Sequence, residues 1–200
     1  MRITLIVFIL LFSVSAVNAE IHFFSGYEKA ENPFLFDREN QIFINIGQGI
    51  AGTWMLEPPK NPVPYNMLQL QYSQPIKFFR LPSRLSANYI QTIGYGVSKT
   101  TRGNTWNWQD YTTMIAFLSV DSPFVWTNKL YFGSGIGTGI QAVENERIDT
   151  KFLLGLKIFI GYAFLQRWRL EAFFHHFSNG STSPQNYSYN FYGFGVGYNF

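Results

Sequence analysis

The residues best suited to chemistry lie near the C-terminus, where His176 and Ser178 are separated by a single residue. A histidine beside a serine can remove the hydroxyl proton and so prepare the oxygen to attack an ester carbonyl. On a β-strand, residues two apart point to the same face. Asn186 and Asn190 follow in the same stretch of chain. The spacing therefore predicts a nucleophile and a base on one face, with amide side chains close behind them.

The face that carries this pair is the apolar face of its segment. The same parity continues backwards through Phe174, Ala172, Leu170 and Trp168. The opposite parity carries the polar residues Arg167, Arg169, Glu171 and His175, and we expect His175 to point inward with Glu171 and Arg169 in a polar network. In a soluble sandwich the apolar face would be buried in the core, whereas in an outer-membrane barrel it faces lipid. A hydrolase on a lipid-facing wall would attack lipid.

Composition favours the membrane barrel. Charged residues make up only 14% of the chain and aromatic residues 19%, against roughly 25% charged residues in soluble domains. The chain has no cysteine, which excludes disulfides and thiolate metal sites. The net charge of +3 is unclustered, so nothing indicates a nucleic-acid-binding stripe.

The N-terminus has the features of a secretory signal. Arg2 precedes an apolar stretch over 3–12, and Val17-Asn18-Ala19 supplies small residues before a cleavage point after Ala19. The apolar stretch is too short for a membrane anchor. We therefore expect a signal peptide over 1–19 and one domain over 20–200.

Eight segments alternate with a period of two, as strands do when their two faces differ. They are 41–55, 66–78, 85–98, 111–120, 127–141, 151–164, 167–178 and 190–200. In nearly every segment one face is large and apolar and the other is small or polar, which is typical of a membrane barrel with an apolar exterior. A soluble sandwich or lipocalin-like barrel would need charges to cover its exterior, and too few are present. We predict an all-β, eight-stranded antiparallel transmembrane barrel.

This topology places the chemistry at one end of the barrel. With both chain ends periplasmic, the connections near 56–65, 99–110, 142–150 and 179–189 are external and those near 79–84, 121–126 and 164–166 are periplasmic. The segment 167–178 then runs outward and 190–200 returns. His176, Ser178 and Asn190 gather at the outer leaflet, where lipopolysaccharide lies.

The stretch His176-Phe177-Ser178-Asn179-Gly180, with Asn186 and the aromatic closing strand, resembles the lipid A 3-O-deacylase family of outer-membrane barrels. The resemblance is specific over the C-terminal residues and is supported more loosely by the eight-strand pattern. It implies hydrolysis of the ester-linked 3-hydroxyacyl chain at position 3 of lipid A, without a metal or organic cofactor. It further implies that Ser178 is the nucleophile and His176 the general base, and that Asn186 stabilises the oxyanion.

The chain departs from the family at the third catalytic position, where the acid of the family falls on Asn190. An asparagine can still orient a histidine through its amide oxygen, but it carries no charge with which to stabilise the imidazolium. Glu144 or Glu146, in the neighbouring external loop, is the alternative partner of His176.

Two other functions compatible with a small barrel remain open. A non-enzymatic barrel with a role in adhesion or membrane integrity would be consistent with Asn190. A lipid A acyltransferase is disfavoured, because its catalytic groups are expected around an interior acyl pocket and not on the lipid-facing wall. The expected partners are lipopolysaccharide and outer-membrane lipid, and a homodimer is left open.

Overall fold

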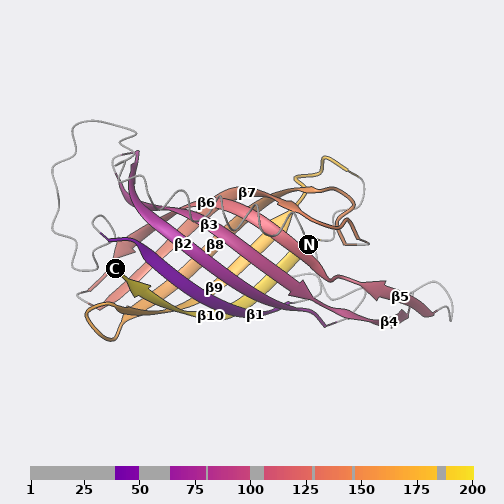
Figure 1. Cartoon of the computed structure of the whole chain (residues 1–200), viewed down its shortest axis with the longest axis horizontal. Helices are drawn as coiled ribbons and strands as arrows, with labels where there is room; N and C mark the ends of the chain where they lie inside the picture. The colour runs from indigo at the N-terminus through magenta and orange to yellow at the C-terminus, as the bar shows by residue number, and fades with distance from the viewer. Residues whose placement is uncertain are drawn as a thin grey trace.

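The described part of the computed structural model is a closed barrel with a short hairpin extending from one end (Figure 1). The structure describes residues 39–49, 64–79, 81–99, 106–127, 129–145, 147–183 and 188–200. The predicted signal peptide (1–19) and the segment after it lie outside these ranges, as do residues 50–63, which comprise the end of the predicted segment 41–55 and most of the proline-rich connection near 56–65. Within them, no helix is long and apolar enough to cross a membrane.

The barrel strands are β1 (Gln41–Gly49), β2 (Asn66–Phe78), β3 (Leu81–Ile93), β6 (Thr113–Val125), β7 (Leu130–Gln141), β8 (Phe152–Ala163), β9 (Trp168–Ser178) and β10 (Tyr189–Asn199). Their order around the barrel is β1-β10-β9-β8-β7-β6-β3-β2. The first and last strands pair antiparallel from Gln41 opposite Asn199 to Gly49 opposite Phe191. This pairing closes the sheet, so the predicted eight-stranded antiparallel barrel is confirmed.

The predicted boundary between the segment 85–98 and the connection near 99–110 was wrong. The end of that segment forms β4 (Tyr95–Lys99) and the end of the connection forms β5 (Trp106–Asp110), and the two strands make a separate two-stranded sheet. The predicted segment 85–98 is divided at Gly94, where a Cβ atom would lie 2.3 Å from the Cβ of Tyr65. Only glycine tolerates that approach. The barrel wall ends at this position, and the chain continues into β4.

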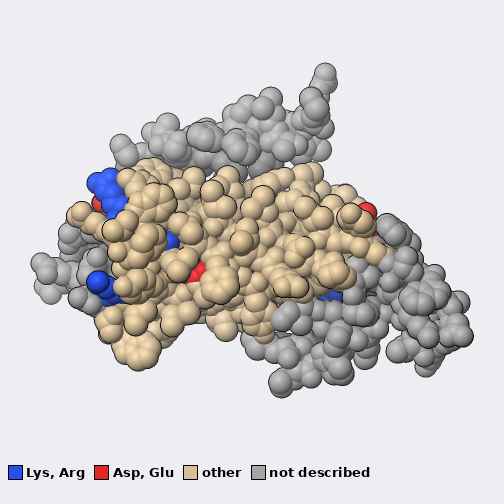
Figure 2. Space-filling model, turned by 90° about the horizontal axis from the view of Figure 1, so that it is seen from below, with Lys and Arg blue, Asp and Glu red and all other residues tan. Residues whose placement is uncertain are grey.

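The wall is apolar outside, as the alternation predicted. The side chains of Ile44, Ile136 and Phe194 are 59%, 59% and 62% exposed, although all are large and apolar. Figure 2 shows a surface on which charged groups are few and gather mainly towards one end. Such a surface is stable in hydrocarbon and not in water.

The interior at the barrel end that carries the β2–β3, β6–β7 and β8–β9 turns is polar. The buried Glu171 carboxylate accepts hydrogen bonds from Arg84 Nη1 at 3.0 Å, Lys157 Nζ at 3.2 Å and the Tyr131 hydroxyl at 3.0 Å. Asp121 accepts a hydrogen bond from Ser86 Oγ at 2.8 Å. Paired in this way, buried charges do not carry the full penalty of desolvation.

The interior towards the opposite end, where β9 leads into β10, is aromatic, which differs from the small or polar face that we expected. A Cβ atom at Gly155 would lie 2.5 Å from the Phe117 ring, so glycine on β8 makes room for that ring. His175 points inward as predicted, but it does not join the polar network. Its ring centroid lies 4.0 Å from that of Phe177, with the rings tilted, and 5.6 Å from that of Phe117, which it meets edge-on. Neither ring nitrogen is hydrogen-bonded within the described structure. Aromatic packing, and not hydrogen bonding, therefore holds His175.

Candidate active site

A hydrogen bond between neighbouring strands joins His176 to Asn190. The β9–β10 register sets these residues directly opposite each other, and directly opposed residues of an antiparallel pair point to the same face. His176 Nδ1 lies 2.7 Å from Asn190 Oδ1. Because an amide oxygen only accepts, this contact favours the tautomer with its proton on Nδ1. Nε2 is then the ring nitrogen that can act as a base.

Ser178 ends β9 on the same outward face as His176, and both side chains are half-buried. Its partner on β8 is Leu154, and that of His176 is Leu156. Among the described contacts, no hydrogen bond joins the Ser178 hydroxyl to the His176 ring. In enzymes without substrate, such bonds are often absent and tighten in the substrate complex.

The turn after Ser178 is fixed by Asn179, whose side chain is fully buried. Asn179 Oδ1 accepts the backbone N–H of Ser181 at 2.9 Å, and its backbone carbonyl accepts the Thr182 hydroxyl at 2.8 Å. Asp149, from the β7–β8 connection, accepts the Ser183 hydroxyl and lies 3.5 Å from Asn179 Nδ2. An acidic side chain of the β7–β8 connection therefore holds the turn that follows the candidate nucleophile.

Asn190 is held on its other side by two hydroxyl groups. Its amide nitrogen donates to Ser188 Oγ at 3.2 Å. The Tyr65 hydroxyl donates to the Asn190 carbonyl at 3.3 Å and accepts its backbone N–H at 3.2 Å. Tyr65 lies just before β2, outside the spanning strands, and burial raises the pKa of its phenol although Arg147 and the Asn190 bond oppose the shift. The phenol therefore stays protonated at neutral pH and keeps both bonds.

The other sequence-predicted residues are not brought into this cluster. Asn186 and Glu146 lie outside the described residues. Glu144 is exposed, and no described contact joins it to His176. Sequence reasoning missed Tyr65, Ser188, Asp149 and Arg147. The first and last of these contact the site from 125 and 41 residues away along the chain, and no local motif marks them.

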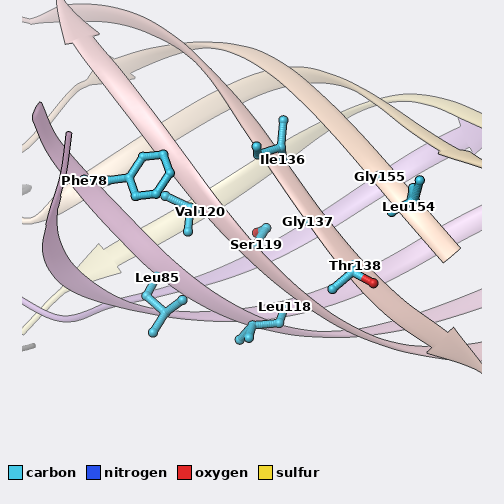
Figure 3. A pocket seen from close by; sticks show the side chains of 10 residues that line it. All are labelled: Phe78, Leu85, Leu118, Ser119, Val120, Ile136, Gly137, Thr138, Leu154 and Gly155. Atoms are coloured by element: carbon cyan, nitrogen blue, oxygen red, sulfur yellow. The ribbon is translucent and has the colours of Figure 1, made fainter. Parts of the chain in front are cut away.

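A shallow groove of about 510 Å³ crosses the outer wall beside the site. Its lining comes from β2, β3, β6, β7 and β8 (Figure 3). Leu154 and Thr138 stand opposite each other on β8 and β7 and line one end, whereas Phe78 lies at the other end. Because Leu154 is also the cross-strand partner of Ser178, the groove leads away from the candidate nucleophile. Its lining is predominantly apolar, as an acyl chain requires.

The described residues contain no group of three or more His, Asp or Glu side chains that could hold a metal ion. The chemistry of the cluster is that of a hydroxyl, an imidazole and an amide, which together can perform nucleophilic attack and proton transfer.

Comparisons with known proteins bear on the family and on the fold of the chain. The family model described as "Lipid A 3-O-deacylase (PagL)" matches residues 67–199. No curated protein matches the chain. Among solved structures, Neisserial surface protein A is similar with a TM-score of 0.55 and 12% identity over 81% of this chain and 97% of that one. At this identity the likeness shows the barrel fold alone.

Two further solved structures are similar at lower scores. The outer membrane enzyme PagL has a TM-score of 0.48 and 12% identity, and the match covers 79% of this chain and 98% of that one. The outer membrane protein Ail of Yersinia pestis has a TM-score of 0.46 and 12% identity over 81% of this chain and 99% of that one.

Proposed function

Since the chain belongs to the lipid A 3-O-deacylase family, we propose that it hydrolyses the ester-linked 3-hydroxyacyl chain at position 3 of lipid A. The protein is a barrel of the Gram-negative outer membrane. The observation that carries the proposal is the 2.7 Å contact of His176 Nδ1 with Asn190 Oδ1, beside Ser178 on the lipid-facing wall. A base and its orienting partner thus share a face of the wall with a hydroxyl, where the ester of a membrane lipid can approach.

The reaction divides into two acyl-transfer steps. His176 Nε2 removes the Ser178 proton while Ser178 Oγ attacks the ester carbonyl. We assign Asn186 to stabilise the oxyanion, an interaction of a kind that typically contributes ~10²–10³-fold to kcat. The carbon–oxygen bond to the sugar then breaks as His176 gives its proton to the departing sugar oxygen, which leaves as a hydroxyl, and the acyl chain stays on Ser178. Water, activated by the same imidazole, cleaves that ester and releases the 3-hydroxy fatty acid.

We propose that the groove beside Leu154 binds the acyl chain of the substrate. A chain whose carbonyl carbon lies at Ser178 can extend over Leu154 and continue between Leu118 and Ile136 on the outer wall. These side chains are 42%, 52% and 59% exposed, so hydrocarbon reaches them without displacing the barrel core. Little desolvation is required, since the chain already lies in lipid.

Thr138→Trp should slow the hydrolysis of long-chain esters and leave the hydrolysis of short-chain esters unchanged. The indole would fill the end of the groove nearest Ser178, and we expect kcat/KM for a long-chain 3-hydroxyacyl ester to fall by about tenfold, because losing even a few methylene contacts has effects of this size. A butyryl ester, which does not reach the groove, should be cleaved at the wild-type rate. Ile44→Trp on β1 is the matched control, since Ile44 is exposed on the wall but does not line the groove. Equal losses on both esters would refute the assignment of the groove.

The function itself is tested by mass spectrometry of lipid A from a Gram-negative host. The host expresses the wild-type chain, Ser178→Ala or no barrel, and heat-modifiable gel migration confirms insertion. We expect loss of one 3-hydroxyacyl chain with the wild type only, and fragmentation should assign the loss to position 3.

Each other outcome has a defined meaning. Loss from another position would retain a deacylase and refute the positional assignment. A gain of an acyl chain would indicate a transferase. Identical spectra from folded proteins, in a host whose lipid A carries the 3-O chain, would indicate a non-enzymatic barrel.

A further inference from the structure

A buried arginine of the β7–β8 connection binds the backbone that leads into the candidate site. Arg147 is 4% exposed, and its Nε and Nη2 donate to the Ser188 carbonyl at 2.8 and 2.6 Å. A forked pair of bonds to one oxygen fixes both the position and the direction of that carbonyl.

Three tyrosines enclose the same guanidinium. Its Cζ atom lies 4.8, 5.2 and 5.9 Å from the ring centroids of Tyr65, Tyr111 and Tyr189. Cation–π contacts of this length are favourable and stronger where water is excluded. Arg147 is therefore held by the barrel mouth and does not reach the lipid-facing surface.

The residue that Arg147 binds has an unusual backbone. Ser188 has φ = 51°, in the left-handed region that residues other than glycine seldom occupy. Such a conformation persists only where surrounding contacts impose it, and the two bonds from Arg147 are such contacts. With its backbone held, Ser188 directs Oγ at the Asn190 amide nitrogen, 3.2 Å away.

We propose that Arg147 is a positioning residue which, through Ser188, orients the Asn190 amide so that its oxygen faces His176. If the amide rotates by half a turn, its nitrogen donates to Nδ1 and the proton moves to Nε2, where the imidazole cannot accept from Ser178. The external loop thereby sets the tautomer of the base without touching the substrate. This inference rests on the proposed function for its kinetic consequence but not for its structural one.

The first measurement reads the tautomer directly, by ¹⁵N NMR of histidine-labelled protein in detergent micelles at a pH where His176 is neutral. The signals of His176 are assigned with His176→Ala, and the signals of His175 serve as an internal reference in the same barrel. We expect the Nδ1–H tautomer in the wild type and a mixture in Arg147→Ala. Arg167→Ala, at an exposed arginine before β9, is the matched control and should leave the spectrum unchanged. An unchanged His176 tautomer in a folded Arg147→Ala barrel would overturn the proposal.

The second measurement is a double-mutant cycle on deacylation. We expect Arg147→Ala to lower kcat by on the order of 10–10²-fold with KM nearly unchanged, the size of effect that misplaced catalytic groups produce. In the Asn190→Ala background the same substitution should have little effect, because no amide remains to be oriented. Equal losses in both backgrounds would mean a merely structural role and would refute the proposal.

Two controls complete the design. If Arg147→Ala does not fold, Arg147→Lys keeps the charge but lacks the fork, and it should show the same tautomer mixture and the same coupling to Asn190 at smaller amplitude. A wild type that cleaves no lipid A but still shows the Arg147-dependent tautomer would refute the deacylase and leave the positioning role standing.

Discussion

Alanine at Ser178 or at His176 is expected to lower kcat by on the order of 10⁶-fold, and the double variant should lose no more than either single variant. The reason is that the two groups act in one step. Without the imidazole the hydroxyl is a poor nucleophile, and without the hydroxyl the imidazole has no proton to accept. The measurement is single-turnover hydrolysis of lipid A by refolded barrels in detergent micelles.

Ser134→Ala is the matched control for this pair, because Ser134 is an exposed serine on β7 outside the candidate site. It should retain the wild-type rate. Losses at His176 and Ser178 that multiply in the double variant would show that the two residues act independently. The Ser–His mechanism would then be wrong even if lipid A is hydrolysed.

The barrel was predictable from the sequence because its signal is local. A strand with its apolar face in lipid alternates over a few residues whatever its partners are, and β2 begins and ends where the alternation over 66–78 does. The hairpin β4–β5 was not predictable in this way. The wall ends at Gly94, where the backbone and side chain of Tyr65, 29 positions earlier, leave no room for a side chain, and the local alternation carries no sign of that contact.

In the candidate site, too, the local features were predictable from the sequence and the long-range contacts were not. His176 and Ser178 share a face by spacing alone, and the return of β10 beside β9 brings Asn190 close to them. That Asn190 lies directly opposite His176 depends on the register of β9 and β10. The sequence alone does not fix this register, because the connecting loop is long. Arg147 and Tyr65 reach the site across the barrel mouth from distant parts of the chain. No local sequence pattern predicts contacts of this kind.

Asn190→Ala is expected to lower kcat by roughly 10³–10⁴-fold, close to the effect of disturbing the orienting residue in a charge-built triad. The 2.7 Å contact with His176 Nδ1 would be lost, and the ring would be free to adopt the unproductive tautomer. Asn45→Ala, inside the barrel on β1, tests whether an equivalent exchange in the wall disturbs folding. Full activity of a folded Asn190→Ala barrel would show that another group, such as Glu144 or Glu146, orients the base.

The Asn190→Asp variant tests whether the site requires an amide, and not a carboxylate, at this position. A carboxylate accepts the Nδ1 proton equally well and stabilises the imidazolium, but it cannot donate to Ser188 Oγ, and at 3% exposure its charge is costly to bury. Because these effects oppose each other, we expect kcat to stay within about tenfold of the wild type. A rise of kcat towards 10⁴-fold would instead mean that the natural asparagine impairs a site that works best with a charged third residue. A modest change, together with the large loss in Asn190→Ala, would mean that the hydrogen bond, and not the charge, is what this site requires of its third residue.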